Sequence, residues 1–157
     1  MSALDVRSSD GDHVIALFHP LLITHFARPP TERELATIRA LVEQAKRESS
    51  TGGMLFVVAR RDATGGIRPH VREFFERLTR ENAGRFGASA VVVRMQGFAA
   101  SLMRSFLTSL VLLSGKRSLL RIFASTDDAC RWLAPQHGID PTALLRAYEQ
   151  ATAKIAR

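Results

Sequence analysis

The feature that most constrains the fold is an apolar run that passes directly into a polar, glycine-rich turn. Residues 54–59 read MLFVVA, and residues 60–66 read RRDATGG. A short continuous apolar run bounded by turn residues is typical of a strand that is buried on both faces of a sheet. We therefore predict a central strand whose carboxyl end opens onto the main candidate site.

Length and composition indicate one domain. The chain has 157 residues, of which 46% are hydrophobic and 24% are charged, so it can bury one sizeable core. The single cysteine, Cys130, excludes an internal disulfide framework and a cysteine-rich zinc site. Residues 1–11 are polar and lack the apolar core of a signal peptide, so we expect a cytoplasmic location.

The net charge points to anionic partners without choosing among them. A formal charge of +7 favours nucleic acid, an acidic protein face or a membrane surface. The simpler interpretation, which we favour, is a solvated surface rich in arginine.

The first part of the chain predicts a hairpin followed by a helix. Residues 13–18 and 21–26 are strand-like runs, separated by a His-Pro pair that suits the turn. Residues 31–34 read TERE, a capping box in which each end side chain can hydrogen-bond to the other residue's backbone N–H. The apolar stripe that follows has helical spacing, so one face of this helix should pack on the sheet.

The middle of the chain continues the alternation of strands and helices. Pro69 suits the first turn of a second helix, where its missing N–H costs little. Residues 88–95 form a β-branched run of the kind found in buried parallel strands. A third helix should cover about 98–114, and a fifth strand 118–124.

The C-terminal part predicts two further helices. Ser125 or Thr126 can cap a short helix after the fifth strand, and residues 135–138 should break the chain. Asp140 and Pro141 are a cap followed by proline at the first helical position, which predicts a final amphipathic helix. We treat this helix as an extension that could dock on the domain, exchange with a neighbour or await a partner.

This order of elements predicts an α/β fold. The sheet should be mixed and five-stranded, with the hairpin followed by parallel strands joined through right-handed βα crossovers and flanked by helices. We divide the chain into a flexible N-terminus at 1–12, an α/β domain at 13–134 and a C-terminal helical extension at 135–157.

The third helix is the most apolar and carries a candidate interface. Arg104 near its middle, and a length at the short limit of about 17–25 residues, argue against a transmembrane segment. Its wide apolar stripe is either core against the sheet, which we favour, or core plus a remainder that faces a partner. The candidate interface residues are Met103, Phe106, Leu110 and Leu112.

Two segments resemble the STAS-like, or SpoIIAA-like, superfamily, which includes anti-sigma factor antagonists. One is Asp62-Ala63-Thr64-Gly65 after the central strand. The other, residues 121–133, reads RIFASTDDACRWL and resembles that group's strand, acidic cap and Ala-x-x-Trp-Leu ending. The resemblance covers residues 13–134. It implies a non-enzymatic, cofactor-free regulatory or scaffolding module that binds a kinase or another signalling protein, with a homodimer left open.

The resemblance also implies a phosphorylation switch. In antagonists of this superfamily a serine in an Asp-x-Ser-Gly segment is phosphorylated, which ends partner binding, and Thr64 stands at the matching position. A phosphate there would lie close to several arginines and could reorder the loop. The simpler interpretation, which we favour, is an ordinary turn threonine. The predicted partner-binding or phosphoacceptor loop consists of Asp62, Thr64, Gly65 and Gly66.

An alternative hypothesis places a small-anion, nucleotide or lipid site at the same edge of the sheet. Open α/β sheets bind ligands beyond the carboxyl ends of their strands. The candidate anion-binding rim consists of Arg60, Arg61, Arg68 and Arg94.

Other kinds of site are not expected from the sequence. Nucleic-acid binding through net charge ranks last, because no interleaved aromatic platform accompanies the charge. The spacing of His19 and His25 does not suit a metal site. The chain has no nucleophile elbow, P-loop or dinucleotide fingerprint.

Overall fold

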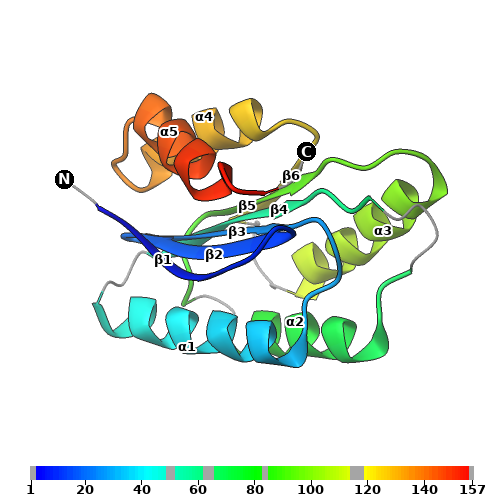
Figure 1. Ribbon diagram of the computed structural model, residues 1–157. Coiled ribbons are helices and arrows are strands. Elements are labelled where there is room, and N and C mark those ends of the chain that lie inside the picture. The colour runs from blue at the N-terminus through cyan, green and yellow to red at the C-terminus, as the bar shows by residue number, and fades with distance from the viewer. Residues whose placement is uncertain (1–2, 49–51, 62–65, 83–84, 114–118, 156–157) are drawn as a thin grey trace.

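A mixed sheet runs through the structure, and its strands lie side by side in the order of the sequence (Figure 1). The computed structural model describes residues 3–48, 52–61, 66–82, 85–113 and 119–155. Within these ranges the strands are β1 (Leu4–Ser9), β2 (His13–Phe18), β3 (Leu21–Phe26), β4 (Gly53–Val58), β5 (Ser89–Val93) and β6 (Leu120–Phe123). The helices are α1 (Glu32–Glu48), α2 (Pro69–Glu81), α3 (Gly97–Leu113), α4 (Thr126–Gln136) and α5 (Pro141–Thr152).

The predicted hairpin and central strand are confirmed. β2 and β3 pair antiparallel, from His13 opposite Phe26 to Phe18 opposite Leu21, and the turn between them contains a cis His19–Pro20 bond. β4 pairs parallel with β3 on one side and with β5 on the other, and β5 pairs parallel with β6. The apolar run therefore lies inside a largely parallel sheet, as its composition indicated.

The N-terminus differs from the prediction. Residues 4–9 form a sixth strand, β1, which pairs antiparallel with β2, whereas we expected a flexible segment over 1–12. β1 is an edge strand, mostly exposed, and its register shifts between Val6 and Ser8 as in a β-bulge. An exposed edge strand buries few apolar side chains, so its sequence LDVRSS carries little of the usual strand pattern.

The strand order explains how the helices are distributed. Right-handed crossovers that always step to the next strand in the same direction place their helices on one face of a sheet. Figure 1 shows α1, α2 and α3 together on one face and α4 and α5 on the other. Because the strand order never reverses, this sheet has no switch point of the kind that forms a ligand crevice in doubly wound folds.

The predicted helix starts are confirmed in atomic detail. The capping box forms, since the Thr31 N–H donates to Glu34 Oε1 at 3.0 Å and the Glu34 N–H donates to Thr31 Oγ1 at 3.2 Å. Pro69 opens α2, and Ser125 caps α4 by accepting from the Asp128 N–H. Asp140 caps α5 by accepting from the Ala143 N–H at 3.0 Å.

The chain break expected at 135–138 begins later than predicted. Pro135 lies inside the last turn of α4, and the helix ends at Gln136. The helix tolerates this proline because, near the helix end, it removes only one backbone hydrogen bond. Pro135 is also exposed, so its ring does not disturb the core. Gly138, with a positive φ of 67°, makes the turn toward α5.

The final helix is part of the domain rather than an extension of it. α5 packs on α4 and on β1 and β2, and it buries Leu144, Ala147, Tyr148 and Ala151. Tyr148 also accepts a hydrogen bond from Arg94 at 3.3 Å and lies 2.8 Å from His25 Nδ1. Together α4 and α5 close one face of the sheet, so the boundary predicted at 134 does not separate two structural units.

Truncating a buried residue of α5 should therefore destabilise the whole domain. Leu144 is 0% exposed, and Leu144→Ala should lower the free energy of unfolding by about 2–5 kcal/mol through lost burial and a new cavity. The exposed Arg146→Ala, two residues on, should change the free energy of unfolding by no more than about 0.5 kcal/mol. Urea denaturation measures both. A Leu144→Ala loss as small as the Arg146→Ala change would mean that α5 does not contribute to the domain's stability.

Candidate functional site

The main cavity of the structure lies between the sheet and helices α2 and α3. Its volume is about 820 Å³, which is within the range of about 300–1,000 Å³ typical of small-molecule sites. α2 packs mainly on its neighbours α1 and α3, so it leaves room above the sheet. Phe75 of α2 reaches down to Phe56 of β4 with an edge-to-face contact at 5.1 Å and helps to set this spacing.

The middle of the cavity is lined mainly by apolar side chains. Met54, Phe56 and Val58 of β4 and Val91 of β5 form the sheet side. The helix side is formed by Val71, Phe75 and Leu78 of α2 and by Met103, Phe106, Leu107 and Leu110 of α3. Met54 and Val58 are four residues apart on a strand, which separates them by about 13 Å. The lining also runs from Phe26 of β3 to Leu120 of β6, about 14 Å across the sheet, so the cavity extends about as far across the strands as along them.

Cationic groups line the carboxyl end of this cavity. Arg60 follows β4, and Arg68 is the N-cap residue of α2. Arg60 Nη1 donates to the Gly66 carbonyl at 3.1 Å, which holds this guanidinium beside the segment that leads into α2. Among the described residues no side chain caps the first turn of α2, and the positive end of this helix lies beside Arg68.

The opposite end of the cavity carries uncharged polar groups. Asn82 is buried, and its side-chain N–H donates to the Leu78 carbonyl at 2.8 Å. Its Oδ1 has no hydrogen-bond partner within the part of the chain that the structure describes. Ser89 Oγ accepts from the Met54 N–H at 3.0 Å. The two ends of the cavity therefore differ in charge.

The predicted four-arginine rim does not converge on one site. Arg60 and Arg68 line the cavity, but Arg61 forms an ion pair with Asp12 at 3.0 Å, and Arg94 donates to Tyr148 on the α5 side. The division follows from the strand geometry, because consecutive residues leaving a strand point to opposite faces. Only Arg60 and Arg68 of the predicted rim line the cavity.

The predicted phosphoacceptor loop is only partly described. Asp62, Thr64 and Gly65 lie outside the described residues. Gly66 is described, and its carbonyl is the acceptor for Arg60.

The predicted interface residues of α3 occupy different environments. Met103, Phe106 and Leu110 are buried and form part of the cavity wall, so they belong to the interior. Leu112 alone among the four is well exposed, at 77%. The wide apolar stripe thus comprises an inner wall and an exposed remainder, which the periodicity could not separate.

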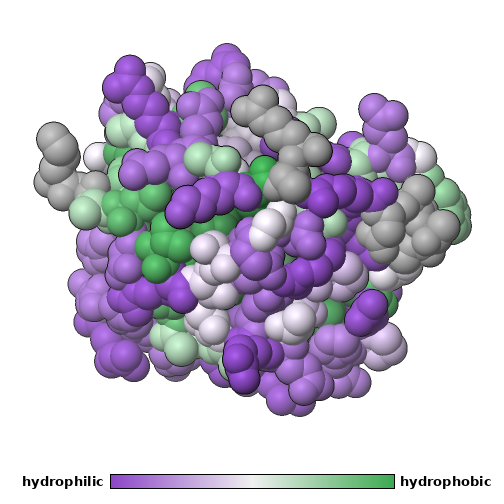
Figure 2. All heavy atoms as spheres, viewed as in Figure 1, coloured by the Kyte–Doolittle hydropathy of each residue, from purple (hydrophilic) through white to green (hydrophobic). Residues whose placement is uncertain are grey.

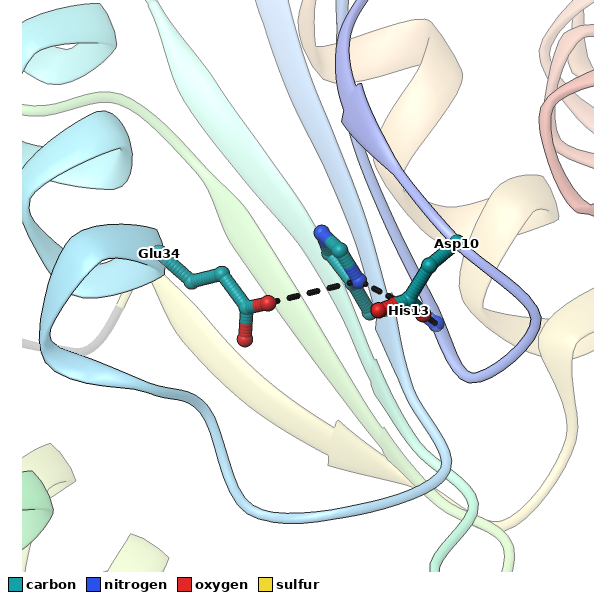
Figure 3. Close-up of side chains that lie close together, drawn as sticks. All are labelled: Asp10, His13 and Glu34. Carbon is teal, nitrogen blue, oxygen red and sulfur yellow. Dashed lines mark hydrogen bonds and ion pairs between the residues drawn. The ribbon is translucent and has the colours of Figure 1, made fainter.

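A second polar cluster lies beside the β1–β2 turn. Figure 3 shows Asp10 from this turn, His13 from β2 and Glu34 from α1 converging. His13 Nδ1 is 2.9 Å from Asp10 Oδ1 and 3.4 Å from Glu34 Oε2. These ligand atoms lie within 4.8 Å of one another, a spacing that would suit a metal ion.

Arg28 already supplies the positive charge that this cluster needs. Its guanidinium donates to both oxygens of Glu34 at 2.8 Å and to Asp10 Oδ2 at 2.7 Å. Burial alone would raise the pKa of Glu34, but the hydrogen bonds from Arg28 and from the Thr31 N–H hold it below its usual value. A cation would have to displace Arg28, so we interpret the cluster as an ion-pair network that joins β1, β2 and α1.

The same network includes a hydrogen bond between Ser8 Oγ and His13 Nε2 at 2.8 Å. On its other side the ring faces Asp10 through Nδ1, which also lies 3.2 Å from Arg28 Nη2, so the order along the network is serine, histidine, carboxylate. This is the order of a hydrolytic triad, but none of the three residues lines the main cavity. We therefore assign them a structural role at the sheet edge.

His25 is the titratable group whose environment is most unusual among the described histidines. It is 6% exposed, and burial together with the nearby charges of Arg94 and Arg61 lowers its pKa from 6.5 to about 4. Arg94 donates to the Tyr148 oxygen, which leaves the Tyr148 hydroxyl proton to donate to His25 Nδ1.

Cys130 is not a candidate nucleophile. It is buried, and burial, followed by the charges of Asp127 and Glu149, raises its pKa to about 12.

Comparisons with known proteins leave this chain without an identified relative. No family model, no curated protein and no solved structure matches it. None of the helices within the described ranges is both long enough and apolar enough to cross a bilayer.

Adding side-chain volume on the two faces of the sheet should change the free energy of unfolding with opposite sign. Val91 and Val92 are adjacent on β5 but face opposite layers, and Val91 lines the cavity. Val91→Phe should raise the free energy of unfolding by about 1 kcal/mol, because the ring fills empty space. Val92→Phe should lower it by about 1–3 kcal/mol, because it overpacks the filled layer under α4. If both variants lose stability equally in urea denaturation, the two layers are packed alike.

The buried His25 should make stability depend on pH. Below pH 6.5 the unfolded chain takes up a proton at this residue, while the folded chain does not until about pH 4. The free energy of unfolding should therefore fall by up to about 3 kcal/mol as the pH falls from 6.5 to about 4. His25→Gln lacks the titration, so the stability difference between wild type and variant should shrink on acidification. A difference that stays constant in urea titrations at several pH values would contradict this.

Proposed function

We propose that this protein binds an amphipathic small molecule that has a long apolar body and an anionic head group, in the cavity between the sheet and helices α2 and α3. The chemical class is a long-chain carboxylate or an acyl-chain phosphate ester. The observation that carries the proposal is a mostly apolar cavity of about 820 Å³ with Arg60 and Arg68 at one end. This corresponds to the lipid-binding alternative among the functions expected from the sequence.

The apolar walls favour a hydrocarbon chain over a nucleotide or a sugar. Each methylene removed from water contributes about 0.8 kcal/mol, so a chain lying along Met54, Phe56 and Val58 would supply most of the binding free energy. A ligand with many polar groups would lose its hydration there without enough hydrogen bonds in return. The apolar lining reaches about 13 Å along β4, which is long enough to accommodate an extended hydrocarbon chain.

The carboxyl end of the cavity favours an anionic head group. Arg68 is exposed, lines the cavity and precedes the uncapped first turn of α2. The positive helix end and the guanidinium groups of Arg60 and Arg68 would together stabilise a carboxylate or phosphate. Arg28 also lines the cavity, but its guanidinium is engaged by Glu34 and Asp10.

The regulatory module implied by the STAS-like resemblance stays a prediction. Its switch residue, Thr64, lies outside the described residues, and three of its four interface side chains on α3 are buried. The geometry of the described residues favours ligand binding over protein docking at these positions.

Ligand binding should depend on the chain length, on the head group and on one arginine. A fluorescent long-chain carboxylate should bind wild-type protein, and an unlabelled long-chain carboxylate should displace it better than acetate or a long-chain alcohol. Arg68→Ala should weaken binding about tenfold, because it removes a charge-assisted contact of about 1.4 kcal/mol. Arg146→Ala, on α5, removes the same charge from the other layer and should leave the affinity unchanged.

Narrowing the cavity gives an independent test of where the ligand lies. Val91→Phe should weaken binding of the long-chain carboxylate while the protein stays folded, as judged by circular dichroism. Binding by Val91→Phe with wild-type affinity, or equal displacement by acetate and by the long-chain carboxylate, would refute the proposal.

A further inference from the structure

α3 carries apolar side chains on its outer face as well as on its inner one. Met103, Phe106 and Leu110 point inward and line the cavity. Phe98 is 78% exposed, and Leu102 and Leu112 are 42% and 77% exposed. Among the described residues, the other large hydrophobic side chains this exposed are Leu119, which follows α3 in the chain, and Val6 on β1. The exposed apolar surface is thus concentrated in one segment.

The three exposed apolar residues share one side of the helix. Because successive residues are about 100° apart, Phe98, Leu102 and Leu112 fall within an arc of about 80°. The small residues Ser105 and Ser109 lie between them on the same side. Figure 2 shows hydrophobic atoms at the right-hand edge of the molecule, near the start of α3. We call Phe98, Leu102, Leu112 and Leu119 the outer α3 patch.

The chain segment that carries this patch has charged residues of one sign only. Residues 82–126 contain no aspartate or glutamate, whereas the whole chain has 15 acidic residues. The same segment contains the basic residues Arg85, Arg94, Arg104, Lys116, Arg117 and Arg121. In the structure Arg104 of α3 is exposed, and so is Arg72 of the neighbouring α2, whose guanidinium lies 5.1 Å from the centre of the Phe106 ring of α3. Arg121 instead lies over the Trp132 ring of α4, on the other face of the sheet. Exposed apolar side chains beside exposed arginines are complementary to a surface that is apolar inside and anionic outside.

From this complementarity we propose that the outer α3 patch docks on the surface of a membrane that contains anionic lipid. The apolar side chains would enter the boundary between head groups and acyl chains, and the flanking arginines would contact lipid phosphates. A second copy of the chain fits this patch poorly, because it would bring another positive surface of a protein that carries a net charge of +7.

The patch adjoins the cavity. Leu119 is 51% exposed and also belongs to the cavity lining, next to Leu120 of β6. Docking through the patch would therefore bring one end of the cavity close to the lipid surface. The docking itself needs only the outer face of α3, so it is independent of whether the cavity holds the ligand proposed above.

Co-sedimentation with lipid vesicles tests the docking. Wild-type protein should sediment with vesicles of phosphatidylcholine and phosphatidylserine at low salt, and much less with phosphatidylcholine alone. Added salt should release most of it, because ions screen the contacts between arginine and lipid phosphate. Equal binding to both kinds of vesicle would overturn the assignment of an anionic surface.

Matched variants separate this patch from exposed apolar surface in general. The double variant Phe98→Ser and Leu112→Ser should reduce the affinity for the anionic vesicles about tenfold or more. Val6→Ser removes a side chain that is 46% exposed on β1, far from α3 in the sheet order, and should have no effect. The proposal would be overturned if the double variant and Val6→Ser lost vesicle affinity equally, or if the double variant kept the wild-type affinity.

Charge reversal completes the test. Arg104→Glu on α3 should weaken vesicle binding more than Arg146→Glu on α5, although both change the net charge equally. Val91→Phe, which narrows the cavity, should still bind vesicles, so a loss of ligand binding and a loss of docking can be told apart. If the double serine variant instead converts a dimer into a monomer in analytical ultracentrifugation while vesicle binding is unchanged, the patch is a contact between two copies.

Discussion

The structure depends on the parallel pairing of β4 between β3 and β5. This pairing requires a crossover before and after β4, and the order of the strands makes each crossover step in the same direction. α1, α2 and α3 therefore share one face, and the other face stays uncovered until the chain returns with α4 and α5. A buried strand needs both of its faces covered, so the C-terminal helices are as necessary to the sheet as the crossover helices are.

The two layers are packed differently, and this difference produces the candidate site. α4 contacts β4, β5 and β6 directly, and with α5 it buries small and medium side chains such as Ala129, Leu133 and Leu144. On the other face, α2 packs mainly on α1 and α3, and aromatic contacts between Phe56, Phe74 and Phe75 fill only part of the gap. A helix held by its neighbours rather than by the sheet leaves an apolar space, which needs only a charged end to become selective for amphipathic molecules.

Much of the fold was predictable, because it follows from local rules. The hairpin, the central strand and the caps at Thr31, Ser125 and Asp140 depend on residues near one another in the sequence. β1 was missed because an exposed edge strand needs few apolar residues. The site was less predictable: periodicity shows which side of α3 is buried, but not whether Met103 and Phe106 meet other side chains or an empty space. The arginines of the predicted rim were separated because residues that leave a strand alternate between its faces, which a list of neighbouring positions does not reveal.

β5 places these two environments on consecutive residues. Val91 faces the cavity and Val92 faces the filled layer beneath α4. Substitutions at the first position can reshape the space offered to a ligand, while the second must keep its volume for the sheet to remain covered. Ligand selectivity and the stability of the fold can therefore change independently in evolution, because alternate residues of the same five-residue strand determine them.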